Sequence, residues 1–167
     1  MPALREEVLP AFREEVLPAR RGDSLEMDEL WTFVQRKKNA HWLWLCVSFR
    51  TRQVVSFALG RRDFLTAQKA WSSLPRSYWK KTVYTDKYVV YPALIGDWQH
   101  RPSEKYTGRT SAVERVNLTF RQRVSALVRK TLSFAKSSKH LWLRLRWFVH
   151  CYNRERQQRL QRKRSIA

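Results

Sequence analysis

The sequence predicts an α/β domain in which helices cover a mixed β-sheet, and the order of its apolar segments is the main evidence. Three runs rich in strand-forming residues come first, at Leu30–Val34, His41–Phe49 and Val54–Leu59. Phe64–Ser73 then has a helical pattern, and Thr82–Thr85 is a fourth strand-like run. Strands, a helix, a strand and further helices are the order expected of a layered α/β domain.

Short polar connections predict that the first three strands are antiparallel neighbours. The stretches 36–39 and 50–53 are each short enough to join strands in a meander. Asp63 precedes the first helix and is interpreted as its N-cap, and Asp97 is interpreted as a turn residue. Residues 98–100 are a candidate fifth strand.

The last third of the chain is predicted to be helical. Residues 111–137 form the first of these helices, and a single stripe of apolar residues recurs in it every three or four positions: Val113, Val116, Phe120, Val124 and Leu127. Residues 138–153 have a similar stripe and predict a last amphipathic helix. Residues 154–167 are a basic tail, interpreted as solvated or in contact with phosphates.

Charge points to nucleic acid as the partner. The chain has 167 residues and a formal charge of +20, and residues 31–167 alone hold thirty bases against six acids. Such an excess fits a polyanion. No apolar run is long enough to span a bilayer, so we expect no membrane partner and a cytoplasmic, nucleoid-associated protein. The cysteines and histidines lack metal-ligand spacing.

The chain is expected to have three parts. Residues 1–22 contain an eight-residue repeat, ALREEVLP and then AFREEVLP, and are interpreted as a poorly ordered leader, with a docking segment as the alternative. Residues 25–153 are the predicted catalytic domain, and 154–167 are the basic tail.

Three acids are candidates for metal chemistry on a phosphodiester. Asp28 lies on the first strand, Asp86 directly follows the fourth, and Glu114 is the only acid between Glu104 and Glu155. Carboxylates from different elements can hold the divalent cations that such reactions use. Alternation along the first strand places Glu26 on the same face as Asp28, so Glu26 is the rival candidate.

Three segments of the sequence resemble the transposase of the insertion sequence 1 family, and the similarity covers about residues 25–153. The segments are EMDELW (26–31), TDKYVVY (85–91) and ERVNLTFRQRVSALVRKTLSFAKS (114–137). The resemblance implies a ribonuclease H-like fold and a DDE-type transposase that cuts DNA and transfers strands. It also implies that Asp28, Asp86 and Glu114 bind two Mg²⁺ or Mn²⁺ ions.

The same resemblance implies a DNA-contacting surface and partners. Arg121 matches a basic residue near the scissile phosphate, and five further positions of the last block are expected DNA or structural positions: Arg115, Asn117, Gln122, Arg129 and Lys130. The expected partners are double-stranded element ends and target DNA, and a homo-oligomer on that DNA. Because no cysteine precedes Cys46, we expect the zinc-finger and helix-turn-helix functions in an upstream-frame protein.

Two other functions fit the same residues. One is a truncated or inactive DNA-binding product that regulates transposition. The other is a ribonuclease H-like nuclease that cuts without joining, which the absence of a strand-transfer product would reveal.

Overall fold

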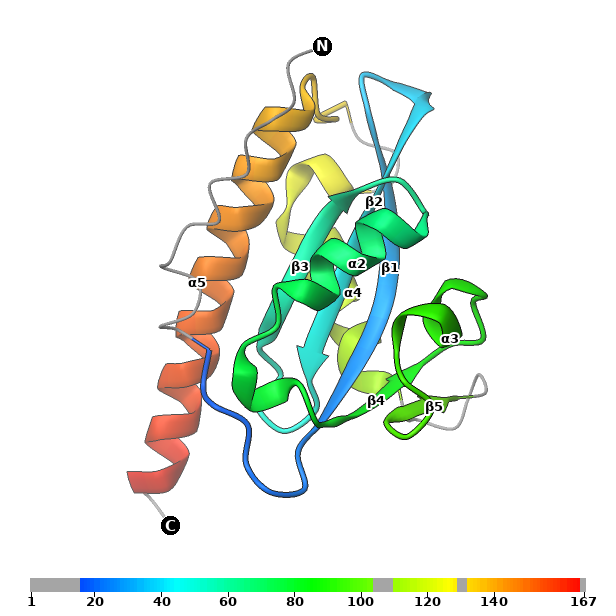
Figure 1. The fold of residues 1–167 in the computed structure, drawn as a ribbon. Helices are drawn as coiled ribbons and strands as arrows, with labels where there is room; N and C mark the ends of the chain where they lie inside the picture. The colour runs from blue at the N-terminus through cyan, green and yellow to red at the C-terminus, as the bar shows by residue number, and fades with distance from the viewer. Residues whose placement is uncertain (1–15, 104–109, 129–131, 166–167) are drawn as a thin grey trace.

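The computed structural model describes residues 16–103, 110–128 and 132–165, and it shows one sheet covered by helices on both faces (Figure 1). The strands follow the order β3-β2-β1-β4-β5 across the sheet. Their bounds are β1 Ser24–Val34, β2 Arg36–Ser48, β3 Val54–Gly60, β4 Thr82–Thr85 and β5 His100–Pro102. The first three strands are antiparallel, and β4 and β5 run parallel to β1. The predicted mixed sheet is confirmed, and its order is compatible with a ribonuclease H-like fold.

The helices form one layer on each face of the sheet. Their bounds are α2 Phe64–Ser72, α3 Val90–Leu94, α4 Ser111–Arg123 and α5 Ser138–Ser165, with short 3-10 turns η1 Arg76–Tyr78 and η2 Ser125–Leu127. In Figure 1, α2 lies in front of the sheet, α4 lies behind it, and α5 runs along the edge next to β3. None of the helices in the described ranges is long and apolar enough to cross a membrane.

Alternation along the strands builds two separate cores. Leu30 and Leu45 belong to the core with α4 and α5, whereas Met27 and Trp44 belong to the core with α2 and α3. All four side chains are at most 4% exposed. At roughly 25 cal/mol for each Å² of apolar surface removed from water, these two cores are the main stabilising contribution to the fold. β1 therefore presents its even-numbered residues to α4 and its odd-numbered residues to α2 and α3.

The first hairpin is longer and tighter than predicted. β1 spans Ser24–Val34, so it contains the predicted run Leu30–Val34 and also Glu26 and Asp28, which were assigned to this strand. Residues 36–39 belong to β2 instead of forming a connector. Gln35 makes the turn with a φ of 62°, in the left-handed region. Acidic residues are poor strand formers, and the partners of Glu26 and Asp28 in the fold compensate for this at the start of β1.

Helix α4 is shorter than predicted. It ends at Arg123, and Val124 is extended with φ −103° and ψ 102°. The stripe itself is confirmed, since Val124 and Leu127 are buried. The bend also buries Ala126, which lies off the stripe of a continuous helix. The prediction of one helix over 111–137 was therefore wrong, because extra apolar burial favours a turn at Val124.

Helix α5 is longer than predicted and includes most of the basic tail. It continues past Asn153 to Ser165. Residues 154–165 contain neither Gly nor Pro, and Arg, Gln, Glu, Lys and Leu are good helix formers. Arg123 of α4 also pairs with Glu155 at 2.8 Å, which joins the start of this extension to the domain.

Two smaller predictions are confirmed, and one lies mostly outside the described residues. Asp63 caps α2 by accepting the Thr66 amide at 2.9 Å, and Asp97 lies in a turn. Residues 1–15 of the predicted leader are outside the described ranges. Val16 is buried in the core with α2, and Leu17 donates its amide to Gln53 at 3.0 Å. The final part of that leader thus packs against the domain.

Candidate metal centre

The sheet brings Asp28 and Asp86 to the same level on neighbouring strands. The parallel pairing of β1 with β4 ends at Glu26 and Tyr84. Asp28 and Asp86 each come two residues later, Asp28 in the middle of β1 and Asp86 just past the end of β4. Strand registry therefore explains why two acids 58 positions apart in the sequence meet.

A third carboxylate joins this pair, and it is not the expected one. Oxygen atoms of Asp28, Glu29 and Asp86 all lie within 4.8 Å of one another. We call these three residues the carboxylate cluster. Sequence reasoning missed Glu29 because alternation assigned it to the opposite face from Asp28.

Asp28 is the electrostatically strained member of the cluster. Its Oδ1 accepts the Glu29 amide at 2.8 Å, and its Oδ2 accepts Nδ2 of Asn117 at 2.6 Å. Burial, the main cause, and the charges of Glu29, Asp86 and Glu114 raise the pKa of Asp28 to about 7, although the Glu29 amide opposes this. A carboxyl group in this state gains from a nearby cation.

Glu29 has a different environment because protein groups occupy both of its oxygens. Arg62 donates Nε and Nη2 to Oε1 at 2.8 and 2.5 Å, and Tyr91 donates its hydroxyl to Oε2 at 2.7 Å. The Glu29 side chain is 1% exposed. Burial and the Glu29 charge raise the pKa of the Tyr91 hydroxyl well above its usual value, so the proton stays on Tyr91.

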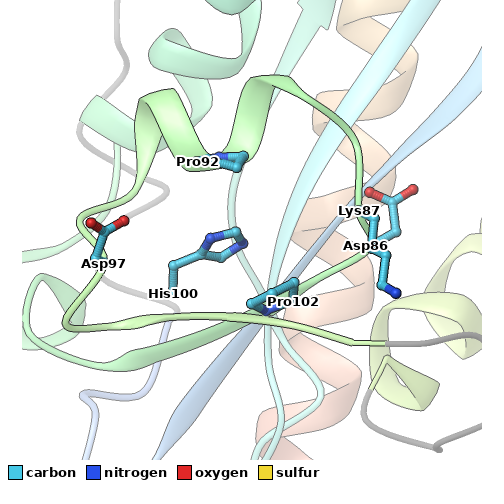
Figure 2. A pocket seen from close by; sticks show the side chains of 6 residues that line it. All are labelled: Asp86, Lys87, Pro92, Asp97, His100 and Pro102. Atoms are coloured by element: carbon cyan, nitrogen blue, oxygen red, sulfur yellow. The ribbon is translucent and has the colours of Figure 1, made fainter.

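Asp86 connects the cluster to an open pocket. Its Oδ1 accepts the Tyr88 amide at 2.9 Å, which fixes the start of the turn after β4. The pocket has a volume of about 350 Å³ and lies between α3 and β5. Figure 2 shows Asp86 and Lys87 at one end of it, Asp97 at the other, and His100 between them.

Glu114 lies in the first turn of α4 and is exposed. Its Oε1 accepts the Thr110 hydroxyl at 2.8 Å, and its charge contributes to the raised pKa of Asp28. Asn117, one turn further along the helix, bonds to Asp28 directly. Glu114 thus neighbours the carboxylate cluster without belonging to it.

The rival acid Glu26 serves a different purpose. It is fully buried, and its Oε2 accepts the Val113 amide at 2.8 Å. Thr110, the residue in the N-cap position of α4, makes no side-chain cap. Glu26 therefore caps this helix from β1. Burial raises the pKa of Glu26 despite that hydrogen bond, and its Oε1 lacks a hydrogen-bond partner within the described ranges.

The expected DNA positions on α4 differ in exposure. Arg115 and Gln122 are exposed and Arg121 is partly exposed, whereas Asn117 is 8% exposed and bonds to Asp28 inside the fold. Arg129 and Lys130 lie outside the described residues.

The geometry of the cluster is compatible with a divalent-cation site. Carboxylate oxygens are the ligands that Mg²⁺ and Mn²⁺ prefer, and the mutual repulsion of three close acids falls when a cation binds. Asp28 has no cationic hydrogen-bond partner among the residues described. In a chain with a formal charge of +20, a site of this kind is compatible with a polyanionic partner such as nucleic acid.

Comparison with known proteins gives the family. The model of the IS1 transposase family matches residues 24–143. The insertion element IS1 protein InsB of Shigella flexneri is 36% identical over 113 residues, which cover 67% of this chain and 82% of that protein. The iso-IS1n InsB protein of Shigella dysenteriae is 33% identical over the same shares. The IS1 4 protein InsB of Escherichia coli (strain K12) is 34% identical over 67% of this chain and 65% of its own. The chain belongs to the IS1 transposase family.

Proposed function

We propose that this chain is a transposase that cuts DNA at the ends of an insertion element and joins the freed strands to a target. The observation that carries the proposal is the convergence of Asp28 and Asp86, with a pKa of about 7 at Asp28. Membership of the IS1 transposase family supports it. The family match includes the complete carboxylate cluster and Glu114.

Asp28, Asp86 and Glu114 would hold two Mg²⁺ or Mn²⁺ ions. When bound, such ions lower the pKa of water and stabilise the attacking and leaving oxygens of a phosphodiester exchange. The hydrogen bonds of the two glutamates favour Glu114 over Glu29 as the third metal ligand. Both oxygens of Glu29 accept hydrogen bonds from Arg62 and Tyr91, whereas Glu114 accepts one from Thr110.

The residues of the chain itself bind and orient the DNA. Arg115 and Gln122 lie exposed on the helix that carries Glu114, so a DNA strand bound at the carboxylates would pass along them. Arg121 extends this surface. Basic groups of this kind neutralise phosphates and fix the register of the duplex, and binding weakens steeply as salt rises. Arg129 and Lys130, which lie outside the described residues, stay expected DNA contacts.

The proposed partners are the element ends, the target duplex and further copies of the chain on that DNA. An upstream-frame protein with zinc-finger and helix-turn-helix segments would recognise the ends. The proposed domain organisation assigns catalysis to residues 25–153 and phosphate contacts to 154–167. The proposed location is the nucleoid.

Strand transfer by the complete two-frame protein with Mg²⁺ tests the proposal. Asp28→Asn, Asp86→Asn and Glu114→Gln should each abolish the joined product, whereas Asp97→Asn, which changes an exposed turn acid, should not. Full activity of Glu114→Gln would rule out its place in the triad. Full activity of the two aspartate variants would rule out the whole site. Cleavage without joining would instead identify a nuclease, and binding without cleavage would identify a regulatory product.

A further inference from the structure

Arg62 is held next to the carboxylate cluster by contacts from several separate segments. It follows β3 and immediately precedes Asp63, the N-cap of α2. Its Nε and Nη2 both donate to Oε1 of Glu29. A Cβ on Gly60 would lie 2.6 Å from the Thr66 hydroxyl, so the glycine allows the close approach of α2 that places this loop.

Aromatic rings complete the environment of the Arg62 guanidinium. Its central carbon lies 4.7 Å from the centroid of the Trp42 ring and 4.1 Å from that of Tyr88. The Tyr88 hydroxyl donates to the Arg62 carbonyl at 3.0 Å, and the Tyr88 amide donates to Asp86. Cation–π contacts at this range are attractive, and they hold the planar guanidinium in one orientation.

These contacts cross a part of the sheet where the backbone ladder has ended. Pairing between β1 and β4 stops at Glu26 and Tyr84, two residues before Asp28 and Asp86. β2 still pairs with Asp28 and β5 with Thr85, but the β1–β4 ladder no longer sets the spacing of the two aspartates directly, so side-chain contacts contribute to it. Glu29 follows Asp28 on β1, Tyr88 is bonded to Asp86, and Arg62 contacts both Glu29 and Tyr88.

We propose that Arg62 is a positioning residue that, through Glu29 and Tyr88, sets the distance between the carboxylates of Asp28 and Asp86. The inference rests on the proposed function, because it assigns Arg62 a role in how tightly that site holds its cations. Lysine cannot replace it, since one ammonium group cannot make the paired donation to Glu29 and also lie flat against a ring.

Binding of Mn²⁺ to the complete DNA-free protein, followed by electron paramagnetic resonance, tests this role without relying on activity. Arg62→Lys and Arg62→Gln should weaken Mn²⁺ binding roughly tenfold or more, as is typical when a group that orients metal ligands is lost. In strand transfer, kcat should fall at limiting Mn²⁺ while KM for DNA stays unchanged. Arg61→Gln is the matched control, because it removes the same charge from an exposed neighbour. In the part of the chain that the structure describes, the cluster's arginine hydrogen bonds come from Arg62 and not from Arg61.

A double variant separates positioning from folding. Arg62→Gln leaves Glu29 buried without its ion pair, so Glu29→Gln combined with Arg62→Gln is measured as well. If Arg62 acts through Glu29, the double variant binds Mn²⁺ no more weakly than the worse single variant. Wild-type Mn²⁺ affinity in Arg62→Lys and in the double variant would overturn the inference. Absence of Mn²⁺ binding in the wild type, or wild-type binding by Asp28→Asn, would instead overturn the proposed function.

Discussion

Asp28 and Glu29 are adjacent in β1, yet the two faces of the sheet treat their charges in opposite ways. On the face covered by α2 and α3, Glu29 accepts hydrogen bonds from Arg62 and Tyr91 and is paired with a cation inside the protein. On the face covered by α4, the hydrogen-bond donors to Asp28 within the described ranges are a backbone amide and Asn117. One carboxylate is neutralised by the fold, and the other is not.

The two carboxylates differ in the free-energy cost of carrying a charge inside the protein. The buried Glu29 carboxylate has a counter-charge in Arg62, whereas an acid whose pKa is raised to about 7 stays charged at neutral pH only at a cost in free energy. A bound cation removes that cost. The contrast supports the proposal that the Asp28 face binds metal and that the Glu29 face positions its ligands.

The largest expected difference is in the strand-transfer rate when the charge of Asp28 or of Glu29 is removed. Asp28→Asn should lower strand transfer on the order of a thousandfold, as the loss of a catalytic group does. Glu29→Gln should lower it by roughly 10- to 100-fold, the range typical of groups behind the metal ligands. Single-turnover strand transfer at saturating Mg²⁺ measures both. Equal losses would remove the distinction between the two faces.

The pH dependence of stability sharpens the same comparison. The pKa of Asp28 is about 7 in the folded chain, against an ordinary value of 3.8. Because the folded value is the higher one, the stabilising contribution is complete below pH 4 and is lost as pH rises through 7. We expect metal-free wild type to lose roughly 2–4 kcal/mol relative to Asp28→Asn between pH 4 and 8.

Urea unfolding at a series of pH values measures this loss. Saturating Mn²⁺ should reduce it, because a cation that binds only the folded chain adds to its stability. A wild type and Asp28→Asn with parallel pH profiles would show that Asp28 is not perturbed.

The sequence predicted the fold well where hydrophobic pattern decides structure. The strand at Thr82–Thr85 and the helix from Phe64 were found because apolar spacing and a cap at Asp63 agree with the tertiary structure. The end of α4 and the turn at Gln35 were not found. At Val124 local helix preference gives way to burial, and residues 36–39 join β2 instead of forming a connector. Both depend on partners that are distant in sequence.

The candidate site was predictable to a similar extent. Asp28 and Asp86 followed from their places on the first strand and directly after the fourth, although their roles remain a prediction. The pairing of these two strands was not predicted. Glu29 and Arg62 could not be found, because three segments meet only in the folded chain. The available signal was the position of Glu29 beside Asp28. That signal was uninformative because the alternation of side chains along a strand places the two residues on opposite faces.

Glu26 tests whether an acid on the Asp28 face can be purely structural. Glu26→Gln keeps an oxygen for the Val113 amide, so stability and strand transfer should stay near wild type. Glu26→Ala removes the external cap of α4 and should lower the free energy of unfolding by roughly 1–3 kcal/mol. Thermal unfolding and strand transfer measure both variants. Loss of activity in Glu26→Gln at unchanged stability would make Glu26, rather than Asp28, the first acid of the site.

The smallest expected difference is in DNA affinity when positive charge is removed from α5 or from α2. This comparison tests which face of the sheet binds DNA. Arg159 and Arg162 are exposed on α5, in the part of that helix beyond the family match, and Lys69 is exposed on α2. If DNA lies along the α4–α5 face, changing both arginines to glutamine removes about two phosphate contacts. Affinity should then fall roughly five- to tenfold, and the slope of log affinity against log salt should decrease by about 1.8. Lys69→Gln should leave both quantities unchanged.

Fluorescence anisotropy with an element-end duplex between 50 and 200 mM salt measures the slopes. An equal effect of Lys69→Gln would mean that DNA binding follows net charge and not one face of the sheet.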